Sequence, residues 1–308
     1  MTPSVLHAVL GPTASGKSVL AMALAEAVGG EIVSCDSAQV FVGLDLGTAK
    51  PTKAEQSQVR HHLIDVISPT EQWSAAQYAA AADRAIAQIR ARGRIPILCG
   101  GTGLWQRALV HGIFQAPEID PELRAAVRRA LVEQGPQVLH EELRRVDPEA
   151  AAKIQPGDPQ RIGRALEVYR QTGVPISRLQ AEHGFREARY RLLAVTPQVE
   201  KEELHQRIKR RTELMYAAGL VEEVRALLDR GIPALAPGLS IIGYRDAAQV
   251  VAGTMTLAQA IERTETSTRQ YAKRQRNWWR NDSDLWPVDP QTSAAQLWER
   301  LREREAAL

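Results

Sequence analysis

The stretch GPTASGKS, residues 11–18, fits the phosphate-binding pattern G-x-x-x-x-G-K-[ST]. It lies between an apolar run at residues 5–10, typical of a buried strand, and an alanine-rich helical stretch at residues 18–28. Glycines in such a loop let backbone N–H groups converge on a phosphate at the positive end of the helix. Lys17 adds a charge, and the hydroxyl of Ser18 is of the kind that binds Mg²⁺. The loop predicts phosphate binding and leaves the phosphate compound open.

Two further apolar runs end in small or polar residues. Residues 31–35 (EIVSC) are followed by Asp36, and residues 95–99 (IPILC) by GGT at 100–102. Alternation of such runs with helical stretches predicts a parallel, doubly wound sheet, in which ligands bind at the carboxyl ends of the strands. Asp36 fits two roles, the cap of a turn, or a general base or Mg²⁺ partner at a ligand site. The glycines likewise fit either a tight turn or close contact with a ligand. None of these runs ends in an acidic residue of the Walker B kind, which disfavours nucleotide hydrolysis.

The middle of the chain has a different pattern. Between residues 118 and 184 the strand signals stop, and three Asp-Pro pairs mark helix starts at residues 120, 147 and 158. We therefore predict an all-helical insertion domain at 118–184 in an α/β, P-loop NTPase-like core formed by residues 1–117 and 185–308. The sheet is expected to resume at residues 190–196, followed by a helix at 200–218.

Composition limits the remaining classes. The 308-residue chain has a net charge of +3, two cysteines without CxxC spacing, and no apolar run near the ~20 residues that cross a bilayer. The N-terminus lacks the basic region of a signal peptide. We expect a cytoplasmic, monomeric protein without a membrane partner. Residues 268–280 hold five basic residues, no acidic ones and three aromatic ones, which fits a solvated helix face or a helix facing nucleic acid.

Several longer motifs follow in order along nearly the whole chain. They are DSAQVF (36–41), GLDLGTAKP (43–51), HHLIDVISP (61–69), GGTGLW (100–105), DPQRIGRALEVYRQTG (158–173), GYR (243–245) and TRQYAKRQRNWWR (268–280). Together with the phosphate loop, they resemble the tRNA dimethylallyltransferase (isopentenyl-tRNA transferase) family in its bacterial form, without a C-terminal zinc finger. Phe41 and Trp105 stand where tyrosine is usual in that family, and Ser18 where threonine is frequent.

The resemblance implies transfer of a dimethylallyl group from dimethylallyl pyrophosphate to N6 of the adenine at position 37 of tRNA, with Mg²⁺ as cofactor. The implied tRNAs read codons that begin with U, and the enzyme contacts their anticodon stem-loop. The pyrophosphate would be held by Gly11, Pro12, Thr13, Ala14, Ser15, Gly16, Lys17 and Ser18, the last also binding Mg²⁺. The implied catalytic residues are Lys17, Asp36 as general base, Thr102, and Arg207 on a lid-like helix. The implied tRNA contacts are Asp36, Ser37, Ala38, Gln39, Thr102, Arg124, Gln160, Arg161, Ile162, Gly163 and Arg164.

Three alternatives remain at this point. A small-molecule P-loop kinase would use ATP, but would not need the GTAKP and RALEV segments. A prenyltransferase acting on free AMP would not need the helical insertion or the basic segment. A tRNA-binding protein without activity would not need Lys17, Asp36 and Thr102 together. Arg207 and Arg211 lie four residues apart on one helix face, which fits a solvated pair as well as a lid. His61 and His62 are expected to be packing and hydrogen-bonding residues.

Overall fold

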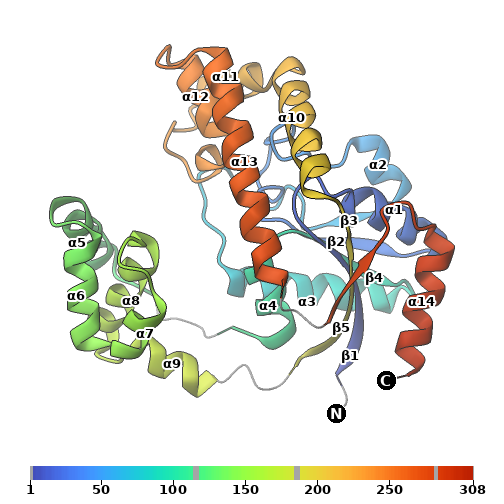
Figure 1. The fold of residues 1–308 in the computed structure, drawn as a ribbon, viewed down its shortest axis with the longest axis horizontal. Coiled ribbons are helices and arrows are strands. Elements are labelled where there is room, and N and C mark those ends of the chain that lie inside the picture. The colour runs from blue at the N-terminus through green and yellow to red at the C-terminus, as the bar shows by residue number, and fades with distance from the viewer. Residues whose placement is uncertain (1–2, 114–117, 184–187, 281–283, 308) are drawn as a thin grey trace. The chain divides into compact units, whose positions relative to one another are not determined.

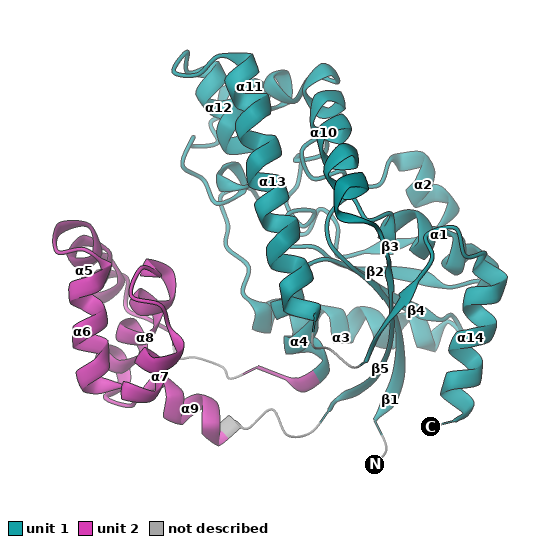
Figure 2. Ribbon diagram, viewed as in Figure 1, with its two compact units in different colours: residues 1–110, 188–308 teal, residues 111–187 magenta. Residues whose placement is uncertain are grey.

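The computed structural model describes residues 3–113, 118–183, 188–280 and 284–307. The chain forms two compact units, Met1–Val110 with Ala188–Leu308 and His111–Glu187, which Figure 2 distinguishes by colour. The insertion predicted at 118–184 falls inside the second unit.

The first unit is built on a parallel sheet, as the sequence predicts. Within the described residues this sheet has six strands in the order β3-β2-β4-β1-β5-β6. The strands are β1 (Ser4–Leu10), β2 (Glu31–Cys35), β3 (His61–His62), β4 (Pro96–Gly100), β5 (Tyr190–Pro197) and β6 (Leu285–Val288). Four of them match the predicted runs to within about one residue at either end. The two edge strands, β3 and β6, are not apparent from the sequence, because one has only two residues and the other contains Pro287.

Helices cover both faces of the sheet. α1 (Lys17–Val28) and α14 (Ala294–Ala306) pack on one face, where Leu24 and Leu297 join Val9, Ile97 and Val195 in a buried cluster. α3 (Ala75–Ala91) packs against β2 and β4 on the other face, as right-handed crossovers require. α2 (Lys53–Gln58) and α4 (Gly103–His111) follow β2 and β4 in the chain.

A second group of helices stands beyond the carboxyl ends of the strands (Figure 1). It consists of α10 (Lys201–Ala217), α11 (Leu220–Asp229), α12 (Tyr244–Val251) and α13 (Leu257–Trp279). α13 packs against both α10 and α12, and a capping box at Thr256 fixes its start. This arrangement brings the basic segment 268–280 to the edge of the sheet where ligands bind. No helix in the described ranges combines the length and apolar character needed to cross a membrane.

The second unit contains helices and, in its described residues, no strand. The helices are α5 (Pro121–Glu133), α6 (Pro136–Val146), α7 (Pro148–Lys153), α8 (Pro159–Thr172) and α9 (Ile176–His183). Asp120, Asp147 and Asp158 cap three of them through side-chain hydrogen bonds, with proline directly after each. The Asp-Pro signals thus mark true helix starts. Gly173 ends α8 with φ 72°, and Gly135 directly precedes α6.

Candidate active site

The phosphate loop connects β1 to α1. Gly16, directly before the helix, has φ 90°, a value that glycine adopts at little cost. Ala14 also has a left-handed backbone, with φ 63°, which costs a residue with a side chain about 1 kcal/mol. Hydrogen bonds from Gly11 N to Gly100 O (3.3 Å) and from Ser15 N to Pro12 O (3.3 Å) hold the loop. The loop is therefore shaped by backbone contacts in a conformation suited to an anion.

The loop amides differ in what they can bind. Pro12 has no N–H, and the amide of Thr13 already donates to Oε1 of Gln275 at 2.8 Å. Within the described part of the chain, the backbone N–H groups of Ala14, Gly16, Lys17 and Ser18 have no hydrogen-bond acceptor. These N–H groups precede or begin α1, where the helix dipole favours an anion. The amides that can hold a phosphate are therefore a subset of the eight residues of the motif.

Lys17 is buried at the start of α1, with 8% of its surface exposed. Its Nζ lies 3.4 Å from the carbonyl oxygen of Pro12. Burial lowers the pKa of the Lys17 ammonium, and the negative charge of Asp36 opposes that shift. A phosphate bound in the loop would supply the negative charge that this ammonium lacks.

Asp36 and Thr102 follow neighbouring strands. The register of β2 and β4 pairs Cys35 with Gly100, so the two turns begin side by side. Ser37 N donates to Thr102 Oγ1 (3.0 Å), and Thr102 donates to Ser37 Oγ (3.3 Å). Asp36 Oδ1 accepts from Ala38 N at 2.9 Å, the turn-capping contact. Only one carboxylate oxygen takes part in that bond, so the cap leaves the second oxygen for chemistry.

A cavity of about 300 Å³ lies in front of these turns. Asp36 lines it together with Thr13, Arg211 and Tyr271, which belong to the phosphate loop, α10 and α13. Burial raises the pKa of the Tyr271 phenol to about 12, with the charge of Asp36 contributing. A carboxylate, a hydroxyl and a cation thus face one space beside the phosphate loop.

Arg207 and Arg211 of α10 both reach the phosphate loop, but in different ways. Arg207 donates to the carbonyl oxygen of Ser15 (3.4 Å) and to Glu203 (2.6 Å). Arg211 donates to Thr13 Oγ1 (2.9 Å) and lines the cavity with Asp36. Burial lowers the pKa of Arg211, and the charge of Asp36 opposes that shift. The family resemblance implies a role for Arg207, whereas the structure places Arg211 in the cavity with the carboxylate.

Two residues of α13 belong to the site although no role could be predicted for them. Tyr271 lines the cavity, and Gln275 bridges the phosphate loop and Gly101. The motif TRQYAKRQ contains both residues and was the only signal in the sequence. Its position beside the phosphate loop depends on the packing of α13.

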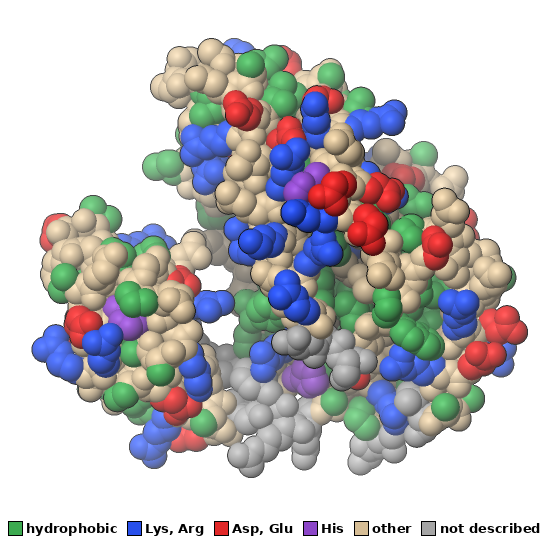
Figure 3. Space-filling view, in the orientation of Figure 1, with side chains coloured by type: hydrophobic (Ala, Val, Ile, Leu, Met, Phe, Trp, Pro, Cys, Tyr) green, Lys and Arg blue, Asp and Glu red, His purple; other side chains and the backbone are tan. Residues whose placement is uncertain are grey.

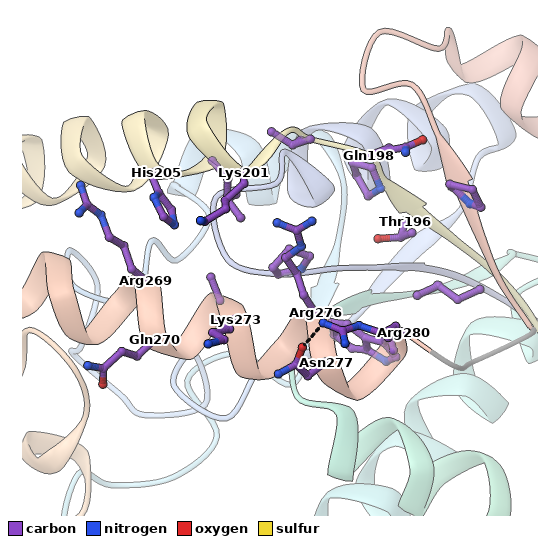
Figure 4. Close-up of a pocket in the computed structure, with 18 residues that line it drawn as sticks. Thr196, Gln198, Lys201, His205, Arg269, Gln270, Lys273, Arg276, Asn277 and Arg280 are labelled. Carbon is purple, nitrogen blue, oxygen red and sulfur yellow. Dashed lines mark hydrogen bonds between the residues drawn. The ribbon is translucent and has the colours of Figure 1, made fainter.

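A second, basic groove of about 680 Å³ lies between α10, α13 and the ends of β5 and β6. Figure 4 shows Lys201 and His205 of α10 and Arg269, Lys273 and Arg276 of α13 around it. Among the described residues that line the groove, none is Asp or Glu. Lys and Arg side chains also gather along α13 on the face drawn in Figure 3.

The predicted tRNA-binding residues of the second unit divide into two kinds. Gln160, Arg161 and Arg164 lie on the surface of α8, and Arg124 on that of α5. Arg124 and Arg164 flank the carboxylate of Glu167 at 3.9 and 3.5 Å. Two further residues, Ile162 and Gly163, are buried, the first in the core of the unit. The surface of the QRIGR segment is therefore formed by its glutamine and its two arginines.

The remaining predicted residues have structural contacts. Gln39 donates to the carbonyl oxygen of Ala49 (3.2 Å), which ties it to the GTAKP loop. His61 hydrogen-bonds to Val59 O (2.8 Å) and His62 to Glu31 (2.6 Å), which confirms the expected packing and hydrogen-bonding roles.

Comparison with known proteins identifies the family. The family model described as IPP transferase matches residues 39–282. A tRNA dimethylallyltransferase 1 of Pelobacter propionicus is 47% identical over 290 residues, which cover 94% of each chain. A tRNA dimethylallyltransferase of Anaeromyxobacter dehalogenans is 48% identical over 301 residues, which cover 95% of this chain and 98% of the relative.

Solved structures agree with this assignment. The full-length tRNA isopentenylpyrophosphate transferase of Bacillus halodurans is 35% identical, with a TM-score of 0.69 over 98% of this chain and 96% of the other. A eukaryotic dimethylallyltransferase described as acting on tRNA is 26% identical, with a TM-score of 0.78 over 98% of this chain and 77% of the other. The chain therefore belongs to the IPP transferase family, the family of the tRNA dimethylallyltransferases.

Proposed function

We propose that the protein transfers a dimethylallyl group from dimethylallyl pyrophosphate to N6 of the adenine at position 37 of tRNA. The tRNAs in question read codons that begin with U, and pyrophosphate is released. Membership of the family supports this function. The observation that carries it is the cavity in which Asp36 lies with Arg211 and Tyr271, directly beside Thr13 of the phosphate loop.

The phosphate loop is assigned to the donor. As the C–O bond of the donor breaks, negative charge grows on the leaving pyrophosphate. Backbone amides of the loop and the Lys17 ammonium can stabilise that charge in a site already arranged for it. Arg207 and Arg211, which donate to Ser15 O and Thr13 Oγ1, bring two more cations to the same loop.

Mg²⁺ is part of this proposal. Ser18 is exposed at the first turn of α1, and Mg²⁺ is commonly held by one or two protein oxygens together with substrate phosphates and water. The described residues contain no group of three or more His, Cys, Asp or Glu that could hold a metal ion, and the exposed Ser18 hydroxyl suits a metal held largely by substrate oxygens. When bound, the metal would neutralise charge on the pyrophosphate. We expect chelation by EDTA to reduce donor binding, measured by calorimetry, and Ser18→Ala to raise the Mg²⁺ concentration required.

Asp36 is assigned as the general base. The N6 amine forms the new N–C bond as the C–O bond breaks, and its proton passes to the carboxylate. General bases contribute about 10² to 10⁴-fold to such steps. Thr102, whose hydroxyl oxygen accepts from Ser37 N, is assigned to contact the adenine. The adenine must leave the stack of the anticodon loop to reach this cavity.

The tRNA is the proposed macromolecular partner. Arg124, Gln160, Arg161 and Arg164 offer side chains for phosphates and unstacked bases of the anticodon stem-loop. We propose that the protein acts as a monomer.

A transfer assay tests this function against its rivals. Purified protein with Mg²⁺ should prenylate an unmodified tRNA that has adenines at positions 36 to 38 when dimethylallyl pyrophosphate is the donor. Phosphorylation of a small acceptor by ATP, without isopentenyladenosine in the tRNA, would refute the proposal in favour of a kinase. Prenylation of free AMP but not of tRNA would identify the third alternative.

A further inference from the structure

Gln275 joins the two halves of the proposed active site. Its Oε1 accepts from the amide of Thr13 at 2.8 Å, and its Nε2 donates to the carbonyl oxygen of Gly101 at 2.8 Å. The side chain has only 6% of its surface exposed. Thr13 belongs to the loop assigned to the donor, and Gly101 directly precedes Thr102 on the acceptor side. One buried amide thus connects segments that are far apart in the sequence.

The turn that carries Thr102 is shaped to receive α13. A Cβ on Gly101 would lie 2.2 Å from Nε2 of Gln275, and one on Gly103 would lie 2.3 Å from Nε1 of Trp278. Neither distance is possible without movement. The two glycines on either side of Thr102 therefore allow α13 to pack closely against the turn.

The chemistry of the bridge requires an amide. Glutamine offers one acceptor and one donor group, which match the N–H of Thr13 and the C=O of Gly101. An ionised glutamate offers only acceptors, so it would place a negatively charged oxygen against the partly negative carbonyl oxygen of Gly101. Lys273 and Arg276, which are near Gln275 in the sequence, line the basic groove (Figure 4). The side chain of Gln275 instead contacts the phosphate loop.

We propose that Gln275 is a positioning residue that sets the separation between the donor pyrophosphate and the acceptor adenine. This inference rests on the proposed function. Gln275 sets this separation because its two hydrogen bonds fix the donor loop relative to the turn that carries Thr102. Asp36 is connected to the same turn through Ser37, which follows it and donates to Thr102 Oγ1. Misplacement of reacting groups by about 1 Å can reduce a rate by about 10²-fold without loss of binding.

The first experiment compares three variants of the full chain under single-turnover conditions. Gln275→Glu keeps the size and one acceptor, and Gln275→Met removes both hydrogen bonds. Gln88→Met, at an exposed position of α3, is the matched control. We expect both Gln275 variants to transfer the prenyl group about 10²-fold more slowly, with the Kd for dimethylallyl pyrophosphate and for tRNA changed by no more than about threefold, a small shift on the energy scale. Wild-type rates in both variants would overturn the proposal, as would a loss accounted for entirely by weaker binding.

A second experiment distinguishes loss of the Gln275 contact from a general folding defect. Gly101→Ala by itself should slow transfer, because the new Cβ displaces Gln275. In the background of Gln275→Ala the clashing amide is absent, and of the contacts closer than 3.4 Å only that with the carbonyl oxygen of Gly11, at 3.3 Å, remains. Adding Gly101→Ala should therefore cost little further rate. Multiplicative losses in the double variant would overturn the proposal, since independent effects combine in that way. Transfer by the wild-type protein in the same assay tests the proposed function separately: its absence would refute that function before any variant is compared.

Discussion

Replacement of Asp36 by asparagine tests the proposed base while leaving its surroundings intact. Asparagine has the same shape, and its side-chain oxygen can still accept from Ala38 N, as Asp36 Oδ1 does at 2.9 Å. The turn after β2 should therefore keep its conformation. What is lost is the charge and the ability to take a proton.

The expected size of the effect follows from these contacts. Loss of a general base slows a step by about 10² to 10⁴-fold, and the lower end corresponds to about 2.7 kcal/mol in the barrier. Donor binding should be retained, because Asp36 carries the same sign of charge as the pyrophosphate. We expect the single-turnover rate of Asp36→Asn to fall by at least about 10²-fold.

The assay follows transfer of a labelled dimethylallyl group to tRNA, with melting temperature and both dissociation constants measured in parallel. Asp229→Asn, an exposed aspartate at the end of α11, is the control and should behave as wild type. A rate for Asp36→Asn close to that of wild type would refute the assignment. So would a loss that follows the melting temperature, because the defect would then be one of folding.

Three further outcomes are expected. Burial lowers the pKa of Lys17, so the ammonium loses its charge at a lower pH than an ordinary lysine. As the pH rises, kcat/KM for the donor should therefore begin to decline before the ordinary lysine value of about 10.4 is reached, and Lys17→Arg should remove that decline. Tyr244→Phe leaves the amide of Gly47 without its acceptor at 3.1 Å and should lower the free energy of unfolding by about 1–3 kcal/mol in a urea titration. Burial alone would raise the pKa of the Glu31 carboxyl. Hydrogen bonds from Arg92, together with other contacts, outweigh burial, so the pKa of Glu31 lies below its ordinary value. The ionised form thus stabilises the fold above the unfolded pKa of about 4.3, and the loss of stability in Glu31→Gln at pH 7 should shrink as the pH falls below that value. A loss of stability in this variant that does not change with pH would contradict that explanation.

Features that depend on neighbouring residues were predictable from the sequence. The phosphate loop, four of the six described strands and the three Asp-Pro helix starts depend on local backbone geometry and on the period of apolar residues. Placing Asp36 and Thr102 at the same edge also followed, because parallel strands end on one side of a sheet. The short edge strands were missed, since their pairing comes from β2 and β5 and from no pattern of their own.

The contacts that complete the site depend on tertiary structure. Gln275 lies 262 residues from Thr13, and Arg211 lies 198 residues from it. No periodicity or local spacing connects such positions, because the packing of α10 and α13 against the sheet brings them together. The sequence by itself determined that this protein has a phosphate loop in a parallel α/β core. Only the tertiary structure determined which loop amides remain available, which arginine of α10 shares a cavity with Asp36, and that a glutamine joins the two sides. The reason is physical: these properties are hydrogen bonds and burial between distant segments, and they exist only once the chain has folded.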